Sequence, residues 1–166
     1  MLSITADGFA RSEAAVAILV QKKQDARRRY VTIRNVLTSN DGFKYEGIFC
    51  PSGQAQEKLM REAYKQAGID PGQVSYMEAH GTGTKIGDLQ ELPVIHDVFC
   101  KTEKREKPLL LGSVKSSMGH SESAAGLCSL AKAIVAIQTG TVPANRNFNT
   151  PRQELAQYFD EKLKAR

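Results

Sequence analysis

The segments EAHGTGTKIGD (residues 78–88) and GSVKSSMGHSE (residues 112–122) decide the fold of this 166-residue chain. Each follows a short apolar run and places a histidine, His80 or His120, in a loop rich in glycine, serine and threonine. Open α/β sheets form ligand crevices at the carboxyl ends of their strands, and glycine beside an imidazole lets a substrate approach closely. The two loops therefore predict one site at the end of a sheet, while a structural role for the histidines stays open.

Hydrophobic spacing around these loops predicts an α/β fold with a largely parallel sheet. The last predicted helix carries one charge, Lys132, and its small apolar residues predict burial on every side between two sheets. The run at residues 14–20 is apolar throughout and is expected to be covered on both faces. Strands are expected at residues 14–20, 30–36, 74–79 and 109–114, and helices at residues 54–67, 89–100 and 123–138.

Smaller signals define the helix ends. Gly68 is placed to end the first helix, and Asp88 and Glu91 have the spacing of a capping box at the start of the second. Pro93 lies inside that second helix, where it would remove a backbone hydrogen bond and is expected to produce a kink. His96, in the same helix, has no glycine-rich setting and is interpreted as structural.

The composition is that of an ordinary globular domain, with 41% hydrophobic and 25% charged residues. No apolar run approaches the roughly 20 residues that span a bilayer, and the first residues lack the pattern of a signal peptide. The net charge of +5 comes partly from basic clusters at residues 22–29 and 101–107. Without interleaved aromatics, such clusters are more typical of solvated connections than of nucleic-acid binding, although they would also help to dock an acidic partner.

The cysteines and the first loop argue against several other classes of site. Cys50, Cys100 and Cys128 are odd in number and widely spaced, which fits neither a disulfide framework nor a zinc site and indicates a reducing compartment. The loop glycines are spaced one residue too widely for a dinucleotide fingerprint, and the Gly-Lys-Ser/Thr order of a phosphate-binding loop is missing. A metal site built from the two histidines and Asp88 would lack the close ligand pairs of most zinc sites.

Taken together, EAHGTGTKIGD and GSVKSSMGHSESAAGL resemble the two histidine motifs of β-ketoacyl synthases, which belong to the thiolase superfamily. The stretch DGFKYEGIFCPSG is most similar to the ketoacyl synthase domain of animal type I fatty acid synthases, with polyketide synthases second. The resemblance implies a partial thiolase-like α/β fold, a layered αβαβα architecture truncated at both ends. It also implies that residues 1–38 end the N-terminal half of the ketoacyl synthase domain and that residues 39–166 form an incomplete C-terminal half.

The resemblance implies a decarboxylative Claisen condensation of malonyl-carrier protein with an enzyme-bound acyl thioester, an acyltransferase reaction of fatty acid biosynthesis. His80 and His120 match the catalytic histidines, and neutral imidazoles there would donate hydrogen bonds to the enolate oxygen. Lys115 and Glu122 match supporting residues and are expected to form an ion pair. Two further positions, Thr82 and Thr84, match contacts to the phosphopantetheine arm, with capping of the local turn as the alternative.

The resemblance also sets the expected cofactors and partners. No cofactor or metal is expected to bind directly, because the substrate is presented on the phosphopantetheine of an acyl carrier protein. The carrier domain is the expected partner, the intact parent enzyme is expected to be a cytoplasmic homodimer, and neither nucleic acid nor membrane is expected to bind.

The family nucleophile, a cysteine among small residues at a strand-to-helix turn, has no match in this sequence. Cys50 precedes a proline in a turn, Cys100 ends a predicted helix, and Cys128 is placed inside another, away from the N-terminus that would lower a thiol pKa. The chain alone is therefore expected to fail at condensation, to retain at most weak malonyl decarboxylation, and to expose apolar faces. The alternatives are an inactive remnant that binds a synthase subunit or carrier protein, part of a related polyketide synthase, or a relative that works without cysteine.

Overall fold

A three-stranded parallel sheet forms the centre of the computed structural model, which describes residues 3–102 and 105–165. Its order is β1 (Tyr76–Glu78), β2 (Leu109–Gly112) and β3 (Leu163–Ala165). In the register of the first pair, Glu78 lies opposite Gly112. Because β1 and β2 end side by side, the two loops that follow them start from the same edge of the sheet. The predicted α/β fold with a parallel sheet is confirmed.

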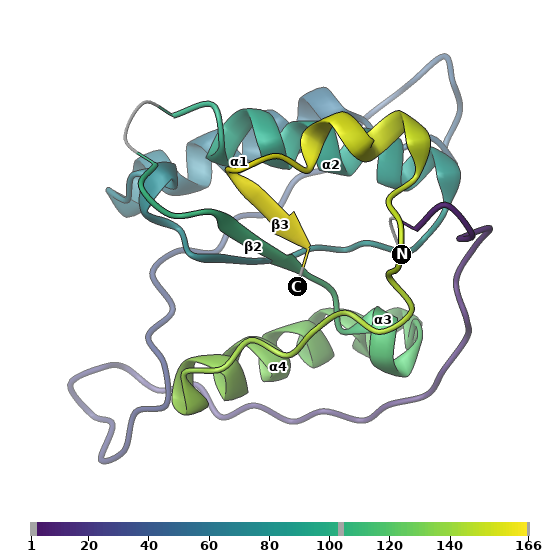
Figure 1. Ribbon diagram of the computed structural model, residues 1–166. Coiled ribbons are helices and arrows are strands. Elements are labelled where there is room, and N and C mark those ends of the chain that lie inside the picture. The colour runs from purple at the N-terminus through teal and green to yellow at the C-terminus, as the bar shows by residue number, and fades with distance from the viewer. Residues whose placement is uncertain (1–2, 103–104, 166) are drawn as a thin grey trace.

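Helices lie on both sides of this sheet (Figure 1). The helices α1 (Gly53–Ala67) and α2 (Lys85–Phe99) lie on one side, and α4 (Ala125–Thr139) lies on the other. Short helical pieces complete the fold: η1 (Pro71–Gln73), α3 (Lys115–Met118), η2 (Glu122–Ala124) and η3 (Gln153–Tyr158). None of the helices in the described residues is long and apolar enough to cross a membrane.

The ends of α1 follow directly from its sequence. The Ser52 side chain accepts a hydrogen bond from the Ala55 amide at the N-cap, and Gly68 ends the helix with a left-handed φ of 64°. The predicted helix and its terminating glycine are therefore confirmed.

The predicted start of α2 was wrong, because the helix begins at Lys85 rather than at Leu89. The side chain of Thr84 is the N-cap, and it accepts a hydrogen bond from the Gly87 amide. Asp88 lies in the first turn instead of capping it. The helix continues through Pro93, so the proline costs one backbone hydrogen bond without ending the helix.

The core lies between the sheet and the α1–α2 layer, and its buried leucines come from α2, β2, η3 and β3. Leu92 of α2 and Leu109 of β2 are almost completely buried, and burying a side chain of this size contributes about 1.5–3 kcal/mol. His96 is structural as predicted: its Nε2 lies 3.1 Å from Asp160 Oδ2 and ties α2 to the turn before β3. The remaining members of this core include Ile95, Val98, Phe99, Leu111, Leu155 and Leu163.

The predicted strands at residues 14–20 and 30–36 were wrong: both segments run as irregular chain without strand pairing. Leu19 and Val20 are 85% and 69% exposed, so the expected covering of both faces is absent among the described residues. The physical reason is that a strand exists only through its pairing, and no described segment offers these two runs a hydrogen-bonding edge.

The predicted burial of the last helix on every side was also wrong. In α4 only Ala125, Cys128 and Ala136 are buried, whereas Val135 and Ile137 are 59% and 65% exposed. One described sheet lies near this helix, and its other side faces the irregular chain of residues 16–33 across a groove instead of a second sheet. The expected exposure of apolar faces is thus observed on α4 and on residues 14–20.

Candidate functional site

The two histidines meet at the carboxyl ends of β1 and β2. His80 comes two positions after the end of β1, and the ring of His120 reaches it from the loop beyond α3. Their ring centroids are 5.4 Å apart and the ring planes are nearly perpendicular, at 87°. The structure therefore brings together the two residues that the sequence singled out.

A buried carboxylate holds the His80 loop in place. Glu91 of α2 accepts hydrogen bonds from the amides of His80 (2.7 Å) and Gly81 (2.8 Å). Burial raises the pKa of Glu91, and those two bonds and the charge of Lys115 oppose the rise. The sequence indicates Glu91 only as a capping residue, because it lies three positions after Asp88. It does not predict the contact of Glu91 with the His80 loop, which lies about ten positions earlier in the chain.

His80 is a neutral imidazole near pH 7. Although part of the residue faces solvent, burial of its ring, then the positive charge of Lys115, and then His120 lower its pKa to about 4. A neutral ring has one N–H donor and one acceptor nitrogen, so His80 can donate a hydrogen bond without carrying a charge.

Backbone hydrogen bonds fix both the position and the tautomer of His120. Its amide donates to the Ala10 carbonyl at 2.7 Å, and its carbonyl accepts from the Ser12 amide at 3.1 Å. The ring Nδ1 accepts a hydrogen bond from the Glu122 amide at 2.9 Å. Because Nδ1 is an acceptor, the ring hydrogen is on Nε2, which leaves an N–H donor on the other side of the ring.

The N-terminal segment forms one wall of the site, a contribution that sequence reasoning missed. The ring of Phe9 lies 4.9 Å from that of His120. Gly119 has a φ of 79°, and a Cβ at this position would lie 2.8 Å from the Ala10 carbonyl oxygen. Glycine is therefore required where the two segments cross. Its place before the histidine was the one local signal of such close packing.

The predicted ion pair between Lys115 and Glu122 was wrong. Glu122 has a left-handed φ of 51°, and its carboxylate pairs instead with Arg11 at 3.1 Å. Lys115 is held near two other carboxylates: burial lowers its pKa, and the charges of Glu91 and Glu78 oppose that change. The backbone turn at Glu122 thus decides the pairing, and sequence spacing alone does not show it.

The two threonines of the first loop are engaged with each other. Thr82 Oγ1 lies 3.1 Å from Thr84 Oγ1, and Thr84 caps α2. The capping alternative is therefore observed for Thr84. A buried aspartate adds to the same turn, because Asp88 Oδ1 accepts a hydrogen bond from the Gly83 amide at 3.1 Å.

Asn145 closes the second loop from a distant part of the chain. Its Oδ1 accepts from the Ser113 amide at 3.0 Å, and its Nδ2 donates to the Leu111 carbonyl at 3.1 Å. The single side chain therefore fastens the end of β2 to the segment after α4. An isolated asparagine in a loop gives no signal of this contact in the sequence.

Cys128 lies nearer a helix N-terminus than predicted, because α4 begins at Ala125. It is buried, with its Sγ 3.6 Å from Ser121 Oγ. Cys100 is also buried, and burial raises its pKa to about 11, which disfavours the thiolate. Cys50 is half-buried beside Pro51. Within the residues that the structure describes, no group of His, Cys, Asp and Glu is arranged to hold a metal ion.

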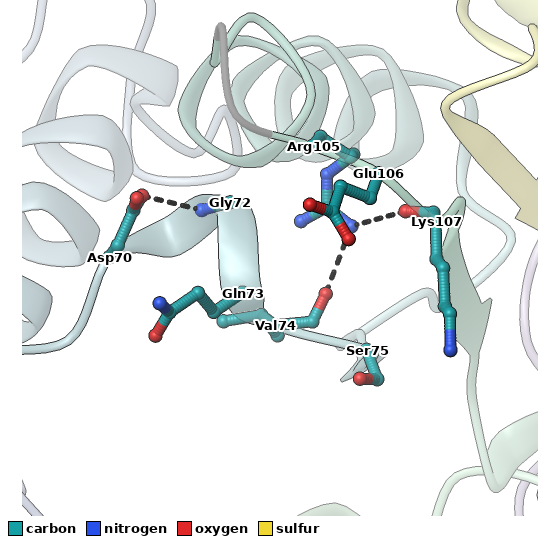
Figure 2. A pocket seen from close by; sticks show the side chains of 8 residues that line it. All are labelled: Asp70, Gly72, Gln73, Val74, Ser75, Arg105, Glu106 and Lys107. Atoms are coloured by element: carbon teal, nitrogen blue, oxygen red, sulfur yellow. Dashed lines mark hydrogen bonds between the residues drawn. The ribbon is translucent and has the colours of Figure 1, made fainter.

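The opposite end of the sheet contains a hollow of about 640 Å³ (Figure 2). Arg105 lies in its wall, but the guanidinium is used for backbone carbonyls: it donates to those of Phe99, Val74, Lys107 and Pro71 at 2.7–3.0 Å. This arginine is a structural cap at the amino ends of β1 and β2. The hollow contains neither histidine.

Known proteins resemble both the sequence and the fold. Residues 30–149 match the family described as "Beta-ketoacyl synthase, C-terminal domain". The chain is 48% identical over 134 residues to a fatty acid synthase of the goose Anser anser anser, covering 81% of the chain and 38% of that protein. It is 46% identical over 154 residues to a highly reducing polyketide synthase of Glarea lozoyensis, covering 91% of the chain and 6% of that protein.

Two solved structures share nearly the whole arrangement. An oxazolomycin ketosynthase domain from Streptomyces albus superposes with a TM-score of 0.90 at 28% identity, covering 99% of this chain and 29% of that one. The ketosynthase of module 1 of the bacillaene synthase from Bacillus amyloliquefaciens gives 0.89 at 29% identity, covering 99% and 30%. The chain thus spans well under half the length of these relatives. Its fold is the thiolase-like α/β fold, in part, and the chain belongs to the β-ketoacyl synthase family.

Proposed function

We propose that this chain supplies the two-histidine wall of a ketosynthase site that performs decarboxylative Claisen condensation in fatty acid biosynthesis. The observation that carries the proposal is the pair of perpendicular imidazoles 5.4 Å apart, His80 and His120. The ring hydrogen of His120 is on Nε2, and His80 is neutral at pH 7. Two uncharged N–H donors can converge on one oxygen without the repulsion that two imidazolium ions would suffer.

In this reaction the malonyl thioester loses carbon dioxide, and the electron pair of the broken bond becomes an enolate. Hydrogen bonds from His80 and His120 stabilise the developing negative charge on the thioester oxygen. The enolate carbon, still joined to the carrier through its own thioester, then attacks the acyl thioester on an enzyme cysteine. The thiolate of that cysteine leaves as the new carbon–carbon bond forms, and the lengthened product stays on the carrier. Acyl transfer to an enzyme thiol belongs to residues outside this chain in the proposal, because both Cys100 and Cys128 are buried.

Other residues have supporting roles in the proposal. Burial of the His80 ring, and after it the positive charge of Lys115, keeps the pKa of His80 low and the ring neutral. Glu122 fixes the tautomer of His120 through its amide. Thr82 offers its hydroxyl to the phosphopantetheine arm of an acyl carrier protein, while Thr84 shapes the same turn. The domain division at residue 38, a homodimeric parent and a cytoplasmic location belong to the same proposal. Identity of 48% with a fatty acid synthase supports that pathway, and identity of 46% with a polyketide synthase supports the polyketide alternative to a similar degree.

Release of carbon dioxide from malonyl-carrier protein tests the proposal. We expect slow release above the uncatalysed rate with the chain alone, and a loss of roughly 100- to 1,000-fold for a variant that lacks one oxyanion donor. The variants are His80→Ala and His120→Ala, with His96→Ala as the matched control because His96 lies in α2, away from both loops.

Mass spectrometry after incubation with an acyl thioester gives the second readout. No acyl group is expected on any cysteine, and no condensation product is expected without the remaining parts of a synthase. Release of carbon dioxide that continues unchanged in the double histidine variant would contradict the proposed roles, as would acylation of Cys128 with product formation.

A second candidate function is a non-catalytic subunit that binds a synthase subunit or carrier protein. The observation that favours it is the apolar surface between α4 and residues 16–33, which contains a groove of about 550 Å³. Val135→Asp on this surface should abolish the association of the chain with a synthase subunit or carrier protein, measured by light scattering. Carbon dioxide release should stay unchanged. Binding that survives in the double histidine variant without any decarboxylation would favour this second function.

A further inference from the structure

A buried ion pair lies behind the histidine site. Lys132 Nζ of α4 is 2.9 Å from Glu78 Oε2 at the end of β1, and the two side chains are only 11% and 8% exposed. The Tyr76 hydroxyl donates to the same carboxylate oxygen, and the Lys132 ammonium lies 5.6 Å from the centre of the Tyr76 ring. Removing two charges from water is costly, so a pair held in this way needs an explanation beyond general stability.

The other carboxylate oxygen points to that explanation. Glu78 Oε1 accepts a hydrogen bond from the amide of Val114, the N-cap residue of α3, which has no side-chain cap of its own. From there the chain runs directly through Lys115 to His120. The charge of Glu78 also supports the protonated form of Lys115 against burial. The Glu78 carboxylate thus faces Lys132 of α4 with one oxygen. Its other oxygen faces the start of the loop that carries Lys115 and His120.

The sheet leaves space for the cluster of Glu78, Lys132 and Tyr76 at Gly112. A Cβ at Gly112, the last residue of β2, would lie 3.0 Å from Lys132 Nζ and would also meet the Tyr76 hydroxyl. Gly112 has an ordinary backbone conformation, since it is not among the glycines with positive φ. The absent side chain therefore makes room for the ion pair rather than for a turn.

We propose that Glu78 and Lys132 form a positioning pair. Lys132 compensates the buried negative charge of Glu78, so the Glu78 carboxylate can hold the Val114 amide. This hydrogen bond sets the position of the loop that carries Lys115 and His120. Without the ammonium group, a buried carboxylate takes up a proton or draws in water, and its hydrogen bond to Val114 weakens. In this way α4, which contributes no side chain to the histidine pair, controls the geometry of the loop. The role of this loop in condensation rests on the proposed function. The inference that the ion pair positions the loop does not depend on that function.

Amide hydrogen exchange of the full chain, read by NMR, tests the proposal. In the double variant Glu78→Met, Lys132→Met, no unpaired charge is left in the interior, so the fold is expected to survive. We expect the Val114 amide to exchange at least about tenfold faster in that variant, a change that a weakened hydrogen bond of about 1.4 kcal/mol produces. Amides of α1 should exchange as in the unaltered chain. Lys132→Arg alone keeps both Glu78 and a positive charge beside it, so exchange at Val114 should stay slow.

Three outcomes would overturn the positioning role. Unchanged exchange at Val114 in the double Met variant would show that Glu78 does not hold the loop. Equal acceleration at Val114 and throughout α1 would show that the pair only stabilises the fold, and so would failure of the double Met variant to fold. None of these measurements needs substrate, so a chain that releases no carbon dioxide contradicts the proposed function while leaving this inference intact.

Discussion

The two ends of the central sheet satisfy their backbone groups in opposite ways. At the carboxyl ends of β1 and β2, the buried carboxylates of Glu91 and Glu78 accept from loop amides. At the amino ends, the guanidinium of Arg105 donates to four carbonyls. At the carboxyl ends, two imidazoles face each other beside these carboxylates, whereas at the amino ends four of the five N–H donors of Arg105 are engaged with backbone carbonyls. The hollow there of about 640 Å³ therefore shows that cavity size does not identify a site.

Replacing Arg105 should produce the largest loss of stability, and the structural damage should be confined to the amino ends of the strands. Arg105→Met removes hydrogen bonds from a charged donor to three half-buried carbonyls and one exposed carbonyl, so we expect the free energy of unfolding to fall by roughly 3 kcal/mol. Urea denaturation measures this loss. Lys107→Met, on the rim of the same hollow, is the control and should change the free energy by less than about 0.5 kcal/mol. An equally small loss of stability in the Arg105 and Lys107 variants would contradict the structural role of Arg105.

Replacing a carboxylate at the other end should cost less and act on the site. Glu91→Gln keeps the shape of the side chain but presents an amide group to one of two backbone donors, those of His80 and Gly81. Leaving a buried donor unpaired costs about 1–3 kcal/mol. Exchange of the Gly81 amide should accelerate by more than exchange in α1. Glu57→Gln, an exposed change in α1, is the control, and comparable effects of the two substitutions would contradict the predicted role of Glu91.

The titration of His80 tests the electrostatics of the site. Because its pKa of about 4 lies below the ordinary value of 6.5, the unfolded chain binds more protons between those values. The stability that His80 contributes is therefore present above pH 6.5 and is lost as the pH falls toward 4. Lys115→Met removes a positive neighbour and should raise the pKa of His80, as followed by the NMR shifts of its ring. An unchanged or lowered His80 pKa would sink the prediction, with His96 in the same spectra as the internal reference.

The smallest effect is expected at the exposed ion pair. Arg11 and Glu122 are 81% and 53% exposed, and such a pair contributes at most about 1 kcal/mol. Arg11→Gln should therefore change the unfolding midpoint only slightly, and less still at high salt. A loss above 2 kcal/mol would mean that Arg11 holds His120 through more than its exposed charge.

Local signals in the sequence predicted the elements that depend on local interactions. Apolar spacing and Gly68 defined α1, and the glycine-rich loops after two strands placed His80 and His120 at one edge. Contacts between distant segments were not predictable, because neither Glu91 nor Asn145 has a neighbour in sequence that reveals its partner. The strands expected at residues 14–20 and 30–36 failed for a related reason: β structure needs a paired edge, and apolar composition alone does not provide one.

The contact between the N-terminal segment and the His120 loop also determines when the site can form during synthesis. Arg11 and Glu122 are 111 positions apart, and the backbone bonds of Ala10 and Ser12 to His120 span a similar length. Residues 9–122 must all have left the ribosome before the second imidazole acquires its contacts with Phe9, Ala10 and Ser12. Closing so long a loop is slow relative to forming α1, so the helix assembles first and the site assembles late.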